Sequence, residues 1–349
     1  MNISCCMIVR NEQDVLDTTL KTASKIFDEL IVVDTGSTDN TIFIAKEYTQ
    51  NVFKCNWEKD FSQARNYSIA RAKNDWVFIL DADENITLFN KDQIESVIVD
   101  EADIGRIKIR NEIDSGLVSI ERVSRMFNSR IFHFEGKIHE QIKPTKGFVK
   151  NLKDIEVSID HIGYKNQIIN KKNKTQRNIE LLKEEISSNS SDPFLYYQLG
   201  KVYSLNNELE LTQGSFEKAL RLNLNYDNEY VVDLIFSYGY TLLKRNLFKE
   251  ALIMEKYLTV YGNQADYCFL MGLIYMNNAL FKKSLSWFGR CLELKEGYIE
   301  GINSFLPCYN IGVIYECLGF NQEAKEWYKK CKGYTLAEKR YEFLKGKCK

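Results

Sequence analysis

The chain of 349 residues lacks an excess of either charge, because 47 lysines and arginines stand against 48 aspartates and glutamates. It therefore has no overall field that would attract nucleic acid or an anionic membrane. It also lacks any apolar run near the roughly 18 residues of a membrane span. The first twelve residues have no basic segment ahead of a long apolar core, so they predict a first β-strand and no signal peptide.

Cysteine is present, but not in the patterns that make a site. The nine cysteines are odd in number and include no C-x-x-C pair. This argues against a disulfide framework and against a structural zinc site. Scattered reduced thiols are typical of an intracellular protein, so we expect a soluble protein of the cytoplasm.

The first half of the sequence alternates between strand and helix patterns. Apolar runs that predict strands cover residues 3–9, 29–34, 51–55 and 75–81. Helical spacing of apolar residues covers 11–27, 37–48 and 62–73. This alternation predicts a largely parallel sheet with helices on its faces. Shorter strand-like pieces follow at 106–113, 124–128, 132–142 and 157–163.

The second half, from about residue 174, is helical and repeats. Glycines recur at positions 200, 239, 272 and 312, and a small residue follows each of the last three by twelve positions, at Ala251, Ser284 and Ala324. The spacing predicts a tetratricopeptide-like solenoid of three to four units. The first unit is expected to be irregular, because its small residue, Ala219, follows nineteen positions after the glycine. Residues 338–349 are expected to form a solvated capping helix.

Polar clusters follow three of the predicted strands, at residues 10–12, 34–37 and 81–83. Parallel sheets bind their ligands at the carboxyl ends of the strands, where these clusters lie. On an extended backbone the side chains of Asp81 and Asp83 would share one side. Such a pair can hold a hard divalent cation, and phosphate oxygens can supply the remaining ligands of that cation. The alternative is that the two acids cap the next element or face solvent.

Six motifs occur in one order along the first half: MIVRNE, VVDTGSTDNT, DFSQARNYSIARAKNDWVFILDADE, RMFN, GKIHE and DHIGY. Together they resemble glycosyltransferase family 2, of the GT-A fold, and in particular members followed by tetratricopeptide repeats. The resemblance implies an α/β, Rossmann-like GT-A domain over residues 1–170 and an all-α helical solenoid over 171–349.

The resemblance also implies a set of nucleotide-sugar-binding residues: Arg10, Glu12, Asp34, Arg65, Asp81 and Arg125. Arg10 and Glu12 can equally pair with each other, and Arg65 and Arg125 can equally be structural ion-pair partners. A Mn²⁺ or Mg²⁺ ion would be held by Asp83, with Asp81 and His161 as further ligands.

Family 2 enzymes invert the anomeric centre in one displacement, which requires a base opposite the leaving group. Only three histidines are present. Glu140 is the first candidate for the base and the adjacent His139 is the second. His133, between two phenylalanines, is expected only to pack.

The resemblance therefore predicts an inverting, metal-dependent hexosyl- or N-acetylhexosaminyltransferase that uses a UDP-sugar. The repeats favour a protein or peptide acceptor, such as a flagellin or a bacteriocin-like peptide. Two alternatives remain open: transfer to a cell-envelope glycan, and an inactive repeat scaffold. The repeats can also serve a homodimer or pack on the catalytic domain.

Overall fold

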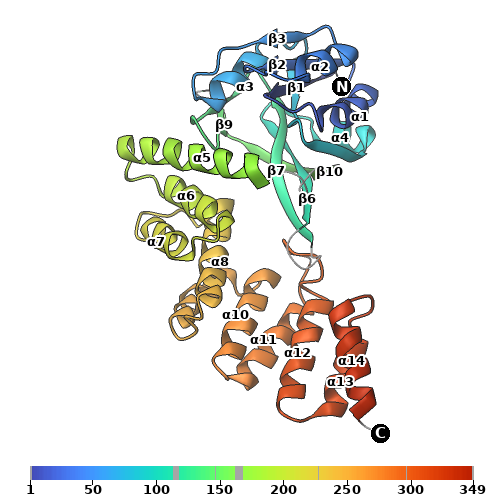
Figure 1. The fold of residues 1–349 in the computed structure, drawn as a ribbon, viewed down its shortest axis with the longest axis vertical. Helices are drawn as coiled ribbons and strands as arrows, with labels where there is room; N and C mark the ends of the chain where they lie inside the picture. The colour runs from blue at the N-terminus through green and yellow to red at the C-terminus, as the bar shows by residue number, and fades with distance from the viewer. Residues whose placement is uncertain are drawn as a thin grey trace. The chain divides into compact units, whose positions relative to one another are not determined.

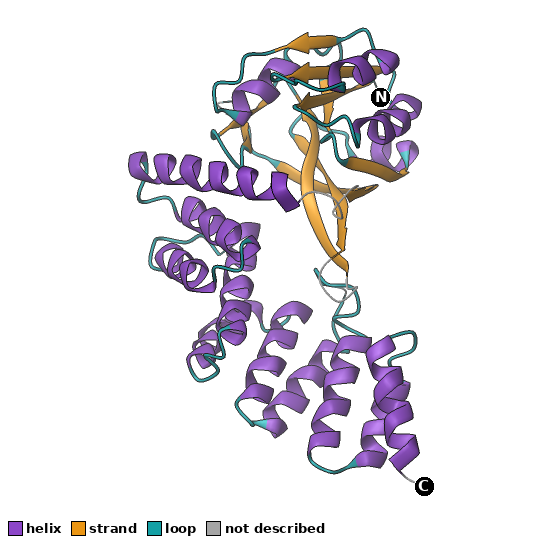
Figure 2. Ribbon diagram, viewed as in Figure 1, coloured by secondary structure: helices purple, strands orange, loops and turns teal. Residues whose placement is uncertain are grey.

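A computed structural model describes residues 2–112, 118–145, 147–161, 168–226, 228–295 and 297–347. The chain divides into two compact units, one of Met1–Glu112 with Ile120–Glu185 and one of Ile113–Ser119 with Ile186–Lys349. The first unit is built on a sheet and the second on helices (Figures 1 and 2). The domain boundary after residue 170 stays a prediction.

The sheet unit contains eight strands in one sheet. Their order is β3 (Val52–Lys54), β2 (Glu29–Asp34), β1 (Ile3–Val9), β4 (Trp76–Ile79), β7 (Val118–Asn128), β6 (Asp103–Glu112), β10 (Asn151–His161) and β5 (Glu84–Phe89). The first four strands are parallel. Strand β7 then pairs with β4 in the antiparallel sense, and β5 does the same with β10. Strands β6 and β10 are again parallel. The sheet is therefore mixed, with the predicted parallel pairing unbroken only from β3 to β4.

Both faces of the parallel half are covered. Alternate residues of β1 enter two different cores: Cys5 and Met7 pack with Leu20 of α1 (Leu16–Ile26), whereas Cys6 packs with Ile69 of α3 (Phe61–Ile69). A strand buried on both faces reads as a continuous apolar run, which is why residues 3–9 show no alternation. Helices α2 (Thr41–Tyr48) and α4 (Lys91–Val97) complete the first core, and α5 (Ile168–Ser188) follows β10.

The piece expected at residues 132–142 is two short strands and not one. Strands β8 (Phe132–Glu135) and β9 (Gln141–Pro144) form a separate antiparallel pair. Residues 136–140 connect them, and Gly136 has φ +99°. The connection carries the predicted His139–Glu140 pair, so these two side chains stand on a turn.

The helical unit consists of successive antiparallel helices. They are α6 (Pro193–Leu205), α7 (Leu209–Leu220), α8 (Glu229–Lys244), the 3₁₀ segment η2 (Glu250–Tyr257), α9 (Leu258–Tyr261), α10 (Ala265–Asn277), α11 (Phe281–Cys291), α12 (Phe305–Cys317), α13 (Asn321–Lys329) and α14 (Thr335–Lys347). Within the described residues no helix has the length and apolar character needed to span a bilayer.

The repeating glycines allow an aromatic ring of the next helix to press on the backbone. A Cβ at Gly272 would lie 2.5 Å from the Phe288 ring, and one at Gly312 would lie 2.6 Å from the Tyr328 ring. Gly200 meets Phe216 in the same way. In all three units the ring follows the glycine by sixteen positions. The glycines are therefore required by the close approach of paired helices.

The first unit is regular, so the prediction of an irregular first unit is wrong. Thr212 follows Gly200 by twelve positions and is fully buried, like Ala251, Ser284 and Ala324. The second unit is the one that differs from the common pattern of glycine and ring. Position sixteen after Gly239 is Glu255, so no ring is available there. Gly239 instead meets Leu270 of α10, and the segment after α8 is the 3₁₀ helix η2.

The predicted terminal helix is present as α14, with Ala337 and Leu344 buried and most other side chains exposed. Residues 348 and 349 of that prediction lie outside the described residues.

Candidate active site

The acidic segment Asp81–Glu84 forms a turn between β4 and β5. The Glu84 N–H donates to the Asp81 carbonyl at 3.2 Å, and the Asp81 N–H donates to the Glu84 carboxylate at 2.9 Å. The prediction of an extended backbone that places Asp81 and Asp83 on one side is wrong, because Glu84 closes this turn. The Glu84 side chain is fully buried.

Two arginines compensate the charge of this turn. Arg65 of α3 places Nη2 2.8 Å from Asp81 Oδ1, and Arg125 of β7 places Nη2 2.9 Å from Asp81 Oδ2. The same nitrogen of Arg125 lies 2.5 Å from Glu84 Oε1. Both arginines are thus ion-pair partners, the alternative that the sequence left open for them.

The pKa values of the two acids move in opposite directions. Burial raises the pKa of Asp81, but the charges of Arg125 and Arg65 outweigh it and hold the pKa well below its ordinary value. Burial raises the pKa of Glu84, the charge of Asp81 adds to this, and Arg125 opposes both. Asp81 is therefore ionised at neutral pH and fixes both guanidinium groups.

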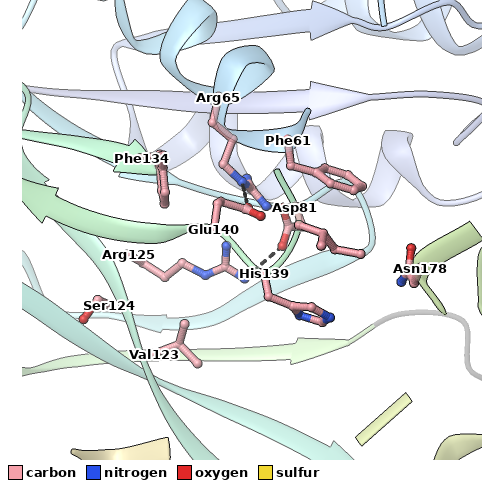
Figure 3. Close-up of a pocket in the computed structure, with 11 residues that line it drawn as sticks. Phe61, Arg65, Asp81, Val123, Ser124, Arg125, Phe134, His139, Glu140 and Asn178 are labelled. Carbon is pink, nitrogen blue, oxygen red and sulfur yellow. Dashed lines mark hydrogen bonds and ion pairs between the residues drawn. The ribbon is translucent and has the colours of Figure 1, made fainter. Parts of the chain in front are cut away.

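Arg65, Asp81 and Arg125 line a pocket of about 330 Å³ in the sheet unit. Five of the predicted residues meet in it: Arg65, Asp81, Arg125, His139 and Glu140. Figure 3 shows the charged ends of Arg65, Asp81, Arg125 and Glu140 converging at the centre of the pocket, while the His139 ring lies to one side. Phe61, Phe134 and Asn178 also contribute to the lining.

Each arginine has one hydrogen-bond donor that is unpaired in the described part of the chain. Arg65 Nη1 and Arg125 Nε are buried and have no hydrogen-bond partner among the described residues. An unsatisfied buried donor is costly, so such groups in a pocket indicate an acceptor-rich ligand. Guanidinium groups match phosphate and carboxylate oxygens best. The pocket is therefore suited to an anion.

His139 and Glu140 enter the pocket from the turn between β8 and β9. His139 has φ +53°, a conformation that costs a side-chain-bearing residue of order 1 kcal/mol or more. Glu140 Oε1 accepts a hydrogen bond from Arg65 Nε. Burial lowers the pKa of His139 although Glu140 opposes the shift, so the ring is neutral at pH 7. Its Nε2 is buried without a hydrogen-bond partner in the described part of the chain.

The other predicted nucleotide-binding residues stand at the ends of the neighbouring strands and do not line this pocket. Asp34 ends β2 and is buried, and its carboxylate accepts the backbone N–H groups of Gly36 and Ser37 at 3.1 Å. Arg10 is exposed after β1, and Glu12, two residues further, is partly buried. Strands β1, β2 and β4 are parallel neighbours, so these residues share the carboxyl edge of the sheet with Asp81.

The predicted metal ligands lie in different settings. Asp83 is partly exposed, with no hydrogen bond or ion pair to any described residue. His161 Nδ1 lies 2.5 Å from Asn111 Oδ1, and its Nε2 lies 3.6 Å from Glu84 Oε1. The described residues include no group of three or more His, Cys, Asp or Glu placed to hold a metal ion. Asp83 fits a cation whose other ligands are phosphate oxygens and water, which is the usual arrangement for Mg²⁺.

Two features of the site could not be assigned from the sequence. Glu84 was visible as a third acid, but its ion pair with Arg125 joins residues 41 positions apart. Arg177 of α5 stacks on Phe61, and burial lowers its pKa with the help of the nearby charge of Arg10.

The expectation that His133 packs is wrong: its side chain is 43% exposed and pairs with Glu135 at 2.9 Å.

Both halves of the chain are similar in sequence to known proteins. Residues 4–143 match glycosyl transferase family 2, and residues 265–298 and 307–335 match the tetratricopeptide repeat. A TPR repeat-containing protein of Synechococcus elongatus is 31% identical over 244 residues, 64% of this chain and 60% of that one. The SPbeta prophage-derived glycosyltransferase SunS of Bacillus subtilis is 28% identical over 278 residues, 76% of this chain and 64% of that one.

The chain thus spans less than two thirds of the length of either relative. Among solved structures, the TPR protein YrrB aligns with 52% of this chain and 88% of its own, at 23% identity and a TM-score of 0.42. The matches to the two families confirm the predicted fold class. The protein contains a glycosyltransferase family 2 domain followed by tetratricopeptide repeats.

Proposed function

We propose that the protein is an inverting glycosyltransferase that moves a sugar from a UDP-sugar to a protein or peptide acceptor. The observation that carries this proposal is a pair of buried arginines in a pocket that also contains Glu140. Each arginine has one donor without a hydrogen-bond partner in the described part of the chain. The match to glycosyl transferase family 2 supports the reaction class.

The arginines would bind the diphosphate of the donor. Asp81 takes one donor from each, which keeps both ionised and oriented, while Arg65 Nη1 and Arg125 Nε remain available for phosphate oxygens. A planar guanidinium held in this way loses little freedom when it binds phosphate. Arg10, Glu12 and Asp34, at the same edge of the sheet, would contact the nucleoside.

Asp83 would hold a Mn²⁺ or Mg²⁺ ion, with His161 and Asp81 as the further predicted ligands. When bound, such an ion offsets the charge that develops on the leaving diphosphate. Asp83 has no competing partner among the described residues, whereas both Asp81 oxygens already accept arginine donors. This difference favours Asp83 as the direct ligand.

Glu140 would be the base that accepts the acceptor's proton as the bond between the sugar and the diphosphate breaks. In the free protein its Oε1 is engaged by Arg65. Phosphate oxygens arriving at Arg65 would compete for that guanidinium and leave Glu140 a stronger base. His139, which is neutral and whose Nε2 has no hydrogen-bond partner among the described residues, is the alternative base on the same turn.

The tetratricopeptide repeats support a polypeptide acceptor, since such solenoids present extended surfaces to peptides and protein segments. The cytoplasm is the proposed location, on the ground that the eight described cysteines are unpaired.

The test is incubation of the full chain with a panel of UDP-sugars and candidate acceptors, with Mn²⁺ or Mg²⁺, followed by intact mass spectrometry. A mass increase of one hexosyl or N-acetylhexosaminyl unit on a polypeptide is expected, and Asp83→Asn should abolish it. Glu135→Gln, an exposed acid on β8, serves as the matched control and should be fully active. Sugar transfer to a lipid-linked glycan alone would overturn the polypeptide acceptor, and no UDP release with any sugar would overturn the activity.

A further inference from the structure

Two pairs of cysteines occupy the same register in the third and fourth helical units. Cys268 stands four positions before Gly272 and Cys291 nineteen after it; Cys308 and Cys331 stand at the same distances from Gly312. All four side chains are buried, with exposures of 0%, 0%, 5% and 1%. One member of each pair lies on the first helix of its unit, and the other lies at or just after the end of the second helix.

The second thiol of each pair makes the same contact with the first helix. Cys291 Sγ lies 3.6 Å from the carbonyl oxygen of Ala265, three residues before Cys268. Cys331 Sγ lies 3.4 Å from the carbonyl oxygen of Phe305, three residues before Cys308. The second thiol of each unit therefore reaches across to the helical turn that carries the first thiol.

Each thiol affects its partner's ionisation. A hydrogen bond from Cys291 lowers the pKa of Cys268, and one from Cys331 lowers the pKa of Cys308. The same hydrogen bonds, together with burial, raise the pKa of Cys291 and Cys331. In each pair, one thiol therefore has a lowered pKa and the other has a raised pKa.

Packing of the repeat does not require cysteine at these positions. The corresponding residues of the first unit are Tyr196 and Ala219, and those of the second unit are Ile235 and Leu258. Those units place an aromatic or aliphatic side chain where the third and fourth units place a thiol. The thiol pairs are therefore an addition to the repeat and not a consequence of it.

We propose that Cys268–Cys291 and Cys308–Cys331 are two oxidation sites, each of which closes to a disulfide that joins the two helices of its unit. With a peroxide as oxidant, the thiolate attacks a peroxide oxygen, giving a sulfenic acid and water. The second thiol then displaces the sulfenic oxygen as a second water, so two thiols and one hydrogen peroxide give one disulfide and two waters. This inference is independent of the proposed function.

The two sites differ in one buried charge. Asp266 precedes Cys268 by two positions and accepts the Tyr298 N–H at 3.0 Å. Its charge opposes the lowering of the pKa of Cys268 by Cys291 and adds to the raised pKa of Cys291. The position corresponding to Asp266 in the fourth unit is Leu306. Each lower-pKa thiol also has a cation that favours its thiolate, Arg290 for Cys268 and Lys330 for Cys308. Because the thiolate is the reactive form, the Cys308–Cys331 pair is expected to close first.

The experiment exposes the reduced full chain to limiting hydrogen peroxide, blocks remaining thiols under denaturing conditions, and maps peptides without reduction. The expected result is a linked Cys308–Cys331 peptide at low peroxide and a linked Cys268–Cys291 peptide at higher peroxide. Closure should raise Tm by several degrees, and dithiothreitol should reverse the rise.

Two variants sharpen the test. Cys331→Ala, which copies the alanine of the first unit, should leave Cys308 alkylated and remove only the first link. Asp266→Asn should bring the two rates closer together. The buried, adjacent Cys5 and Cys6, whose pKa values are raised by burial, are an internal reference and should remain reduced.

The proposal is overturned if the exposed Cys317 is fully oxidised while all four paired thiols remain open to alkylation after unfolding. Closure of Cys268–Cys291 before Cys308–Cys331 would overturn the ordering by charge.

Discussion

The sheet unit gathers four paired charges in one cluster, whereas the helical unit packs rings against glycines. Arg65, Arg125, Asp81 and Glu84 lie in one buried or partly buried cluster, where each charge has a partner. In the helical unit the close contacts are between Gly272 and Phe288 and their counterparts. Replacing a buried ion pair with apolar residues of the same volume is often neutral or stabilising. Stability alone therefore does not explain the charged cluster, whereas the close contacts of the helical unit are packing contacts.

Arg125→Met should give the largest loss of stability. It leaves Asp81 and the buried Glu84 with one guanidinium fewer, and breaking a buried ion pair in this way costs about 3–5 kcal/mol. Urea unfolding measures the change in the free energy of unfolding. Arg122→Met on the same strand, whose partner Asp154 is half exposed, is the control and should change stability by less than about 1 kcal/mol. Equal effects of the two substitutions would mean that the cluster does not hold the turn.

Glu140→Gln should slow sugar transfer by about 10²- to 10⁴-fold, the usual contribution of a positioned base. Donor affinity should change little, because Gln keeps the shape of the side chain beside Arg65. Steady-state kinetics and UDP-sugar binding separate the two quantities. If His139→Asn loses the rate and Glu140→Gln does not, the histidine is the base.

Gly272→Ala should destabilise the helical unit by about 1–3 kcal/mol, because a methyl group would overlap the Phe288 ring. Gly214 of α7 provides the matched control, since a Cβ there meets nothing within 4 Å. Gly214→Ala should stabilise by up to about 1 kcal/mol through helix propensity. Thermal unfolding measures Tm for both variants. A similar shift in Tm for both would mean that the Phe288 ring contact does not determine the effect of the substitution.

Asp266→Asn should change Tm least at low pH, and the difference in Tm from the wild type should grow as pH rises. Burial raises the pKa of Asp266 to about 6, above its ordinary value of 3.8. A group whose pKa is raised by folding contributes its stability below the unfolded value, and this contribution is lost as pH rises through the folded value. The wild type should therefore lose stability relative to Asp266→Asn between about pH 4 and pH 6. Parallel pH profiles of Tm would contradict the shift.

The sequence predicts features that are local. The carboxyl-end clusters of β1, β2 and β4 could be located because each apolar strand ends abruptly in polar residues, and parallel neighbours bring those ends to one edge. The regular first repeat was also within reach, since Thr212 is small enough to stand where the other units have Ala or Ser. The choice of Ala219 as the small residue of this unit hid its regularity.

Features that depend on distant partners could not be predicted. Nothing near Asp81 indicates that β7 inserts beside β4 in the antiparallel sense and supplies Arg125. The turn at Asp81–Glu84 depends on the buried Glu84 carboxylate, which that arginine compensates. The second unit has Glu255 where the others have a ring, and its second helix is the 3₁₀ segment η2, which no residue before it predicts.

Calorimetric titration of UDP into wild type and Arg65→Lys tests most directly whether the arginine pocket binds the diphosphate of a nucleotide sugar. Lysine keeps the positive charge opposite Asp81 but loses the forked donors, among them the unused Nη1. We predict that wild type binds UDP in the presence of Mn²⁺ and that Arg65→Lys binds it about 10- to 100-fold more weakly, a loss of about 1.4–2.7 kcal/mol. Arg71→Lys, outside the pocket, should bind as the wild type does. Equal affinity of wild type and Arg65→Lys, or no binding by the wild type, would contradict the account.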